Sequence, residues 1–267
     1  MSSDDSSSES GESASPIQLA GCEPWSVTGG ERGEAGALVL HGFTGCPQSM
    51  RPLAEAFAAA GYTVELPLLP GHGTTVDDMI TTGWADWSAA AEAAYADLAA
   101  RCERVVVAGL SMGGSLTVWL ASRHPEIAGI VCVNPALRIP DELVAAVRQT
   151  LDGGVDRFPS IGGDLADPEA GESAYDATPL APLLTLAEGT AALRDDLGRI
   201  TCPVLLLTAP EDHTVPPADS DELAAGVAGP VERISLDRSY HVATLDYDRD
   251  LINAEAVAFA GRVTAAG

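Results

Sequence analysis

The sequence contains no lysine, and its 14 basic residues are all arginines. Against them stand 39 acidic residues, so the chain of 267 residues carries a formal net charge of −25. Such a charge repels nucleic acid and anionic membrane surfaces, which argues against both as partners. The composition fits either a salt-adapted protein, because concentrated salt screens the repulsion, or a codon supply poor in lysine.

Long apolar runs are also missing. No stretch approaches the roughly 18 consecutive apolar residues that span a bilayer, and the N-terminus lacks the basic and apolar regions of a secretory signal. The five cysteines are odd in number and scattered along the chain. We therefore predict a cytoplasmic protein with reduced thiols rather than a disulfide scaffold. Because the cysteines and histidines show no metal-ligand spacing, no metal and no other cofactor are expected.

The organisation predicted from composition is a tail followed by a single domain. After the initiator Met, residues 1–15 contain only serine, acidic residues, glycine and alanine. This composition cannot bury enough apolar surface to offset its ordering entropy, so it predicts disorder. Residues 16–267 are of the length expected for one α/β domain.

Short apolar runs alternate with helical patterns from about residue 37 onward. The near-continuous apolar runs predict strands buried on both faces, over Ala37–Leu40, Tyr62–Leu66, Arg104–Ala108, Gly129–Asn134, Pro203–Thr208 and Val231–Leu236. Helices are predicted between them, over Met50–Ala60, Trp84–Arg101, Met112–Arg123, Asp219–Ala228 and Leu251–Val263. This alternation is typical of an α/β fold, with a mostly parallel sheet and helices on both faces.

Two segments depart from the alternation. Residues 17–36 show little periodicity and are compatible with an edge hairpin. Residues 137–182 contain recurring Gly and Pro and no recognisable strand, but Asp141–Leu151 has the periodicity of an amphipathic helix. An excursion of this length is often a lid, and the alternative is a surface insertion that merely covers the sheet.

The strongest chemical signal is the run Gly109-Leu110-Ser111-Met112-Gly113-Gly114, which follows a predicted strand and opens a predicted helix. A nucleophilic serine must project from a tight strand-to-helix turn, and small neighbours avoid clashes there. The helix N-terminus behind Ser111 adds free N–H groups that favour developing negative charge. The pattern predicts that Ser111 is a nucleophile.

An activated serine needs a base, and the base needs an orienting carboxylate. In this type of fold the serine precedes the acid, and the acid precedes the histidine. His241 lies in a loop after the last predicted strand and is the preferred base. Asp212 follows the preceding strand and is the preferred acid. Three other carboxylates are possible acids. Asp141 follows an earlier predicted strand, and Asp237 and Asp246 flank His241.

Two N–H donors are needed for the oxyanion of a tetrahedral intermediate. We expect one from Met112, directly after the nucleophile. The other is expected from Phe43, within the glycine-containing loop His41-Gly42-Phe43-Thr44-Gly45. His41 is interpreted as a residue that orders this loop by hydrogen bonding.

With these residues in place, the chain resembles the bacterial monoacylglycerol lipase and carboxylesterase family of α/β-hydrolases. The matching segments are His41–Gly45, Ser49–Leu53, Gly71–Thr74, Gly109–Gly114, Glu211–Pro217 and Ser239–Asp246. The resemblance implies an α/β-hydrolase fold with a small cap or lid insertion, and it implies Ser111, Asp212 and His241 as the catalytic triad. It further implies that an acidic residue of the cap contacts glycerol. In this chain that residue is Asp176, in Tyr175-Asp176-Ala177-Thr178-Pro179.

These inferences predict a serine hydrolase that cleaves monoacylglycerols to glycerol and fatty acid through an acyl-enzyme. The expected partner is a small lipid ester, with transient contact with lipid aggregates left open. One alternative is a general short- or medium-chain carboxylesterase without glycerol preference. A more remote alternative is a non-catalytic ligand-binding member of the fold.

Overall fold

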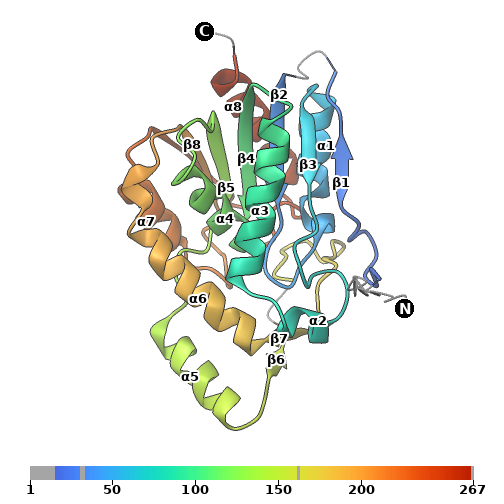
Figure 1. Cartoon of the computed structure of the whole chain (residues 1–267), viewed down its shortest axis with the longest axis vertical. Coiled ribbons are helices and arrows are strands. Elements are labelled where there is room, and N and C mark those ends of the chain that lie inside the picture. The colour runs from blue at the N-terminus through green and yellow to red at the C-terminus, as the bar shows by residue number, and fades with distance from the viewer. Residues whose placement is uncertain (1–15, 31–33, 161–162, 266–267) are drawn as a thin grey trace, which may run out of the picture.

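A computed structural model describes residues 16–30, 34–160 and 163–265. The tail predicted to be disordered, residues 1–15, lies outside the described residues. The described residues form a seven-stranded sheet in the order β1-β3-β2-β4-β5-β8-β9 (Figure 1). Only the edge strand β1 is antiparallel to its neighbour, and the other pairs are parallel. The strands are β1 (Trp25–Val27), β2 (Ala35–Leu40), β3 (Thr63–Leu66), β4 (Arg104–Leu110), β5 (Gly129–Val133), β8 (Val204–Thr208) and β9 (Val231–Ser235).

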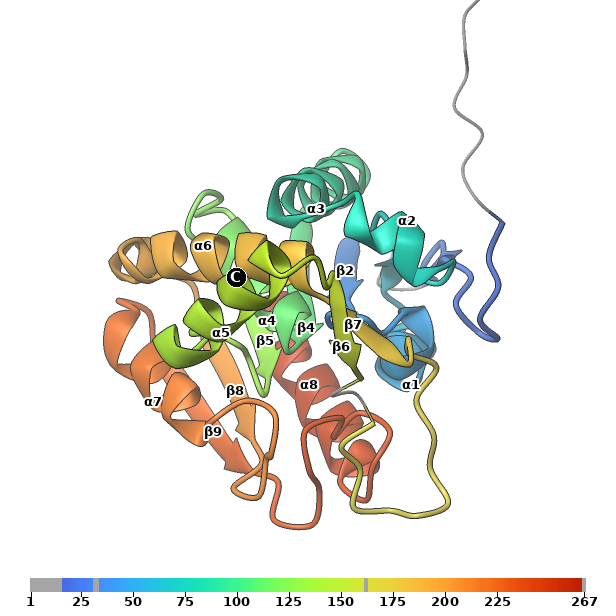
Figure 2. The ribbon, with the colours of Figure 1, turned by 90° about the horizontal axis from the view of Figure 1, so that it is seen from below.

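Helices cover both faces of this sheet, as Figures 1 and 2 show. The α-helices are α1 (Arg51–Ala59), α2 (Val76–Ile80), α3 (Trp84–Ala99), α4 (Met112–Ala121), α5 (Asp141–Asp152), α6 (Leu180–Arg194), α7 (Pro217–Gly226) and α8 (Arg249–Val263). Two short 3₁₀ helices, η1 (Pro47–Met50) and η2 (Leu197–Arg199), lie in the connections. The α/β fold predicted from the alternation of apolar runs and helical patterns is confirmed.

The central strands divide the core in two because successive side chains point to opposite faces. In β2, Leu38 and Leu40 pack into the core under α3, α4, α6 and α7. Ala37 and Val39, one residue away in each case, pack into the core under α1 and α8. Every residue of β2 is buried, which explains why its sequence is apolar without alternation.

Two parts of the regular structure were not predicted. Within the described residues of the segment 17–36, for which an edge hairpin was left open, β1 pairs with β3, with Ser26 opposite Glu65, and not with β2, which lies in the interior of the sheet. The helix α6 was not predicted. Pro182 lies in its first turn, where a backbone N–H has no intrahelical partner and proline is tolerated, so a residue that suggested a loop is part of a helix.

The inserted segment 137–182 lies at the lower end of the sheet in Figure 1 and contains α5, as predicted. The expectation that it contains no strand was wrong. Residues Arg157–Pro159 (β6) and Ala177–Pro179 (β7) form a small antiparallel sheet, with Phe158 opposite Thr178. Strands of three residues are too short to show a period in sequence. We call residues 137–179 the cap segment below.

The prediction of reduced thiols was wrong for two of the five cysteines. Cys22 and Cys46 form a disulfide with a Cα–Cα distance of 5.1 Å, and both residues are buried. The bond ties the segment before β1 to the loop after β2. Cys102, Cys132 and Cys202 are buried and are not in disulfides. The cysteine pattern therefore no longer supports a cytoplasmic location.

Within the described parts of the chain, no helix is both long and apolar enough to cross a bilayer. This agrees with the lack of long apolar runs in the sequence.

Removing the disulfide should destabilise the fold. We expect Cys22→Ala to lower the free energy of unfolding by about 3 kcal/mol, because the bond closes a loop with a sequence separation of 24 and restricts the unfolded chain. Urea unfolding of the variant and of the wild type, each with and without reductant, measures the effect. Reductant should lower the midpoint of the wild type only; an unchanged wild-type midpoint would argue that the bond does not stabilise the fold.

Candidate active site

Ser111 occupies a strained turn between β4 and α4. Its backbone angles are φ 56° and ψ −119°, outside the regions that residues with a Cβ prefer. The Ser111 N–H donates to the carbonyl of Val133 on the neighbouring strand, at 3.0 Å. A Cβ on Gly109 would lie 2.1 Å from the Gly113 carbonyl oxygen, and one on Gly113 would lie 2.1 Å from that of Leu40. The turn therefore requires glycine at both positions.

His241 and Asp212 form a buried pair although 29 residues separate them in the sequence. His241 Nδ1 lies 2.7 Å from Asp212 Oδ2, and the side chains are 9% and 2% exposed. The other carboxylate oxygen, Oδ1, accepts the N–H groups of Thr214 at 2.8 Å and Val215 at 2.7 Å. These bonds fix the carboxylate and leave Oδ2 for the imidazole.

The three rival acids have other surroundings. Asp141 is exposed in the first turn of α5, where a negative charge favours the helix dipole. Asp237 is exposed and accepts the hydroxyl of Ser235. Asp246 is buried, but its carboxylate accepts backbone N–H groups instead of the imidazole of His241.

A cavity of about 50 Å³ brings the expected catalytic elements together. Ser111 and His241 both line it, as does Phe43 from the loop after β2. Met112 begins α4 directly after Ser111, so its N–H belongs to a helical turn whose N–H groups lack intrahelical partners. The arrangement places Ser111, His241 and Phe43 around one small space, and the first turn of α4 follows directly after Ser111.

His41 orders the loop after β2, as predicted. Its Nδ1–H donates to the Gly42 carbonyl at 3.0 Å, while its Nε2 accepts the Leu69 N–H at 3.1 Å. Burial, with a smaller contribution from His72, lowers the pKa of His41 to about 3. The ring is therefore neutral at physiological pH and serves as a hydrogen-bonding bridge.

Asp176 does not line the Ser111 cavity. Its side chain is exposed beside β7, and its backbone carbonyl accepts the N–H of Ser160 at 3.0 Å. Another acidic residue of the cap segment, Glu172, lines the cavity instead. Sequence reasoning missed it, because its position four residues before Asp176 carries no periodic signal.

Glu172 is held firmly at the cavity. Burial raises its pKa, whereas the Gly163 N–H, which donates to Oε2 at 3.1 Å, and nearby His241 act in the opposite direction. A Cβ on Gly45 would lie 2.8 Å from Glu172 Oε1, so glycine makes room for the carboxylate. Gln48 of η1 bonds the peptide groups on either side, donating to the Gly171 carbonyl and accepting the Ser173 N–H, both at 3.0 Å.

Asn134, directly after β5, is a second residue that sequence reasoning missed. Its Nδ2 donates to the His241 carbonyl at 2.8 Å, and its Oδ1 accepts the Ala209 N–H at 2.8 Å. It therefore links the loops that carry the imidazole and its acid partner. The only signal in the sequence is a polar residue at the end of an apolar strand.

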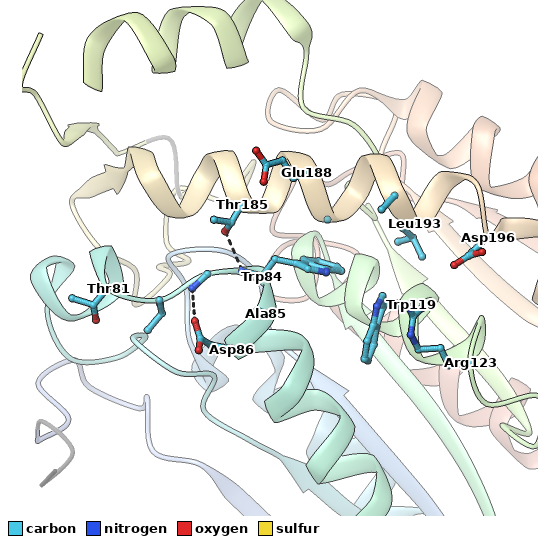
Figure 3. Close-up of a pocket in the computed structure, with 14 residues that line it drawn as sticks. Thr81, Trp84, Ala85, Asp86, Trp119, Arg123, Thr185, Glu188, Leu193 and Asp196 are labelled. Atoms are coloured by element: carbon cyan, nitrogen blue, oxygen red, sulfur yellow. Dashed lines mark hydrogen bonds between the residues drawn. The ribbon is translucent and has the colours of Figure 1, made fainter. Parts of the chain in front are cut away.

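A larger cavity, of about 640 Å³, lies elsewhere, between the start of α3, the end of α4 and α6 (Figure 3). None of its lining residues also lines the Ser111 cavity. Two polar side chains of this cavity bond to neighbouring backbone N–H groups: Asp86 accepts the Gly83 N–H at 2.9 Å, and Thr185 accepts the Trp84 N–H at 3.0 Å (Figure 3). Its size alone does not make it a reaction site.

In the described ranges of the chain, no group of three or more His, Cys, Asp or Glu side chains is arranged to hold a metal ion.

Comparison with known proteins decides the family. Residues 37–255 match the alpha/beta hydrolase family. The chain belongs to this family. This hydrolase is 48% identical over 243 residues to a thermostable monoacylglycerol lipase of Bacillus sp. (strain H-257), covering 90% of this chain and 95% of that protein. It is 27% identical over 240 residues to a carboxylesterase of Bacillus subtilis (strain 168), and the match covers 89% of this chain and 95% of that protein.

Solved structures agree with the assignment. A chain from a study of LipS and LipT, two metagenome-derived lipolytic enzymes, superposes with a TM-score of 0.87 at 43% identity, covering 91% of this hydrolase and 99% of that chain. The monoacylglycerol lipase of Paleococcus ferrophilus superposes with a TM-score of 0.73 at 19% identity, covering 93% and 100%, which shows a shared fold.

The histidines should titrate differently in the folded hydrolase. Burial lowers the pKa of His41 to about 3 and that of His72 to about 4, so neither ring should take up a proton between pH 8 and pH 5. The hydrogen bond and charge of Asp164 raise the pKa of exposed His213, which should protonate at a higher pH than an ordinary histidine. An NMR titration of the five histidines tests both statements.

The same shifts have a consequence for stability. Because the unfolded chain protonates these two imidazoles near pH 6.5 and the folded chain does not, unfolding takes up protons. The stability due to neutral His41 and His72 is present above pH 6.5 and falls as the pH drops toward about 4 and 3. Titration of both rings near pH 6.5 in the folded protein would contradict their burial as neutral groups.

Proposed function

We propose that this hydrolase is a serine carboxylester hydrolase that cleaves monoacylglycerols to glycerol and fatty acid. The observation that carries the proposal is the position of His241, which contacts Asp212 at 2.7 Å and lines the same cavity as Ser111. The 48% identical relative named as a thermostable monoacylglycerol lipase supports the choice of substrate class.

In the proposed reaction, His241 removes the proton of Ser111 as its oxygen attacks the ester carbonyl. Asp212 keeps the imidazole in the tautomer with Nδ1–H and stabilises the imidazolium that forms. The imidazolium then protonates the departing glycerol oxygen, and a water molecule activated by His241 releases the fatty acid from the acyl-enzyme.

The N–H groups of Phe43 and Met112 are the proposed donors to the oxyanion. Both belong to structures that are rigid before the substrate arrives: Phe43 packs edge-on against Trp87 at a centroid distance of 5.7 Å, and Met112 is in the first turn of α4. Donors aligned in advance need no reorganisation, and one such donor typically contributes about 3 kcal/mol to transition-state stabilisation.

Glu172 is the proposed partner of the glycerol hydroxyls. Its carboxylate lines the Ser111 cavity, whereas the side chain of Asp176 is exposed. A carboxylate accepts hydrogen bonds and can bind two neighbouring hydroxyls at once. A simple alkyl ester offers no such hydroxyls, so this contact would favour a monoacylglycerol.

The cap segment is the proposed lid. The Ser111 cavity of about 50 Å³ is far below the roughly 300–1,000 Å³ of sites that enclose drug-sized ligands. A long acyl chain therefore requires part of the cap segment to move away from the sheet before it can enter. Transient contact with lipid aggregates remains a prediction, and so does a cytoplasmic location, which no longer has the support of reduced cysteines.

The second candidate function is a carboxylesterase without glycerol preference, which the relationship to the Bacillus subtilis carboxylesterase favours. The two candidates share the same reaction at Ser111 and differ only in the use of Glu172. A non-catalytic ligand-binding protein would carry out no reaction at Ser111.

Loss of the nucleophile should abolish turnover. We expect Ser111→Ala to lower kcat for p-nitrophenyl butyrate by about 10⁴-fold or more, because the remaining N–H donors and substrate binding cannot replace the covalent step. Ser26→Ala, which removes an exposed hydroxyl on β1, is the matched control and should behave as the wild type. An active Ser111→Ala variant would exclude the proposed mechanism.

Removing the charge of Glu172 separates the two candidate functions. Since a hydrogen bond to a charged group contributes about 1.5–3 kcal/mol, Glu172→Gln should lower kcat/KM for a monoacylglycerol by about 10-fold or more. The ethyl ester of the same fatty acid should be hydrolysed as well as by the wild type. Asp176→Asn serves as the control and should leave both rates unchanged. If Glu172→Gln keeps the wild-type rate on the monoacylglycerol as well as on the ethyl ester, the general carboxylesterase is favoured.

A further inference from the structure

Asp164 lies in the cap segment and contacts both loops that carry the base and its acid. The acid loop, residues 209–216, follows β8 and holds Asp212; the base loop, residues 236–248, follows β9 and holds His241. From the acid loop, the N–H of His213 donates to Asp164 Oδ2 at 3.0 Å, and His213 Nδ1 lies 2.8 Å from Oδ1. From the base loop, the N–H of His241 itself donates to Oδ2 at 3.2 Å.

The backbone of Asp164 adds a fourth contact, because its carbonyl accepts the N–H of Val242 at 3.1 Å. Its side chain is only 16% exposed. Burial by itself would raise the pKa of this carboxyl, but the hydrogen bonds from His213 and His241 outweigh burial and lower the pKa. The carboxylate is therefore charged at neutral pH, and both of its oxygens are used.

A second carboxylate makes the opposite connection. Asp246 of the base loop is 3% exposed, and it accepts two N–H groups of the cap segment, from Ala166 at 2.7 Å and Asp167 at 3.0 Å. It also accepts two from its own loop, from Tyr240 at 3.0 Å and Tyr247 at 2.8 Å. The cap segment and the base loop thus hold each other through two carboxylates, a buried one from Asp246 and a partly buried one from Asp164. Figure 2 shows the yellow loop that follows β6 beside the red loop that precedes α8.

We propose that Asp164 is a positioning residue for the reaction: by binding the acid loop and the N–H of His241 together, it sets the distance between His241 and Asp212. The proposal rests on the proposed function of Ser111, His241 and Asp212. Asp164 touches neither the nucleophile nor the small cavity in which the ester would react. Asp164 acts through the backbone of His241, because it accepts the N–H of that residue. Asn134 holds the other end of the residue, since its Nδ2 donates to the His241 carbonyl at 2.8 Å.

This arrangement has a consequence for the order of events. The base is held in place by a residue of the cap segment, so His241 and Asp212 are fully assembled when residues 164–167 are seated on the base loop. Any part of the cap segment that moves to admit a substrate must therefore leave this short part in place.

The test compares three variants with the wild type, using p-nitrophenyl acetate, whose acyl group is too short to depend on the rest of the cap segment. Asp164→Ala removes all side-chain contacts. Asp164→Asn keeps an oxygen that can accept the N–H groups of His213 and His241. Glu169→Ala removes an equal charge from an exposed position of the same segment and is the control. Each variant is measured for kcat, KM and thermal unfolding, and by NMR for the downfield proton between His241 Nδ1 and Asp212.

We expect Asp164→Ala to lower kcat by about 10-fold to 100-fold with little change in KM, as misplacement of a catalytic group does, and to lose the downfield proton signal. Asp164→Asn should recover most of kcat and the signal, and Glu169→Ala should resemble the wild type. A folded Asp164→Ala with wild-type kcat would overturn the proposal.

If Asp164→Ala fails to fold, Asp164→Glu decides the matter, because it keeps the charge but displaces the accepting oxygens by one methylene group. A folded Glu variant with lowered kcat and a lost proton signal supports positioning, and one with wild-type kcat and the signal overturns it. The proposed function is tested separately, by the dependence of turnover on Ser111 in a protein with Asp164 intact. Failure of one proposal is therefore distinguishable from failure of the other.

Discussion

The strained backbone at Ser111 is the constraint on which the rest of the site depends. A residue with a Cβ at φ 56° and ψ −119° costs conformational energy, and such a conformation persists only where its surroundings impose it. Here the surroundings are the N–H bond to Val133, the close approach of Gly113 to Leu40, and the start of α4. The strain places the hydroxyl at the carboxyl edge of the sheet, where the loops after β2, β8 and β9 can reach it.

Buried carboxylates that accept backbone N–H groups organise those loops. Asp212 binds Thr214 and Val215 within the acid loop, and Asp246 binds the base loop to the cap segment. Asp219, at the start of α7, accepts the N–H groups of Leu137 and Arg138 at 2.7 and 2.9 Å and so anchors the beginning of the cap segment. Each loop end is fixed by a charge-assisted bond that needs no basic side chain. In a chain without lysine, part of the acidic excess therefore has a structural use.

Sequence reasoning predicted those features that depend on local pattern. Buried parallel strands such as β4 are continuous apolar runs, and the turn at Ser111 needs glycine on both sides, so each leaves a signal in consecutive residues. Asp212 and His241 follow from the order of strands, because loops after parallel strands meet at one sheet edge.

What could not be predicted depends on contacts between distant segments. The Cys22–Cys46 disulfide, the place of Glu172 beside Ser111 and the bonds of Asp164 have no counterpart in local sequence. The loop acids of the cap segment look alike in the sequence, and only the path of the chain separates exposed Asp176 from enclosed Glu172.

The central claim is that Ser111 is a nucleophile activated by His241. Mass-spectrometric mapping of the protein after reaction with a fluorophosphonate tests it most directly, because the reagent bonds covalently to an activated serine. The account predicts an adduct on Ser111 in the wild type and a greatly slowed reaction at this residue in His241→Ala. An adduct on another serine, or equal labelling of Ser111 with and without the imidazole, would contradict it.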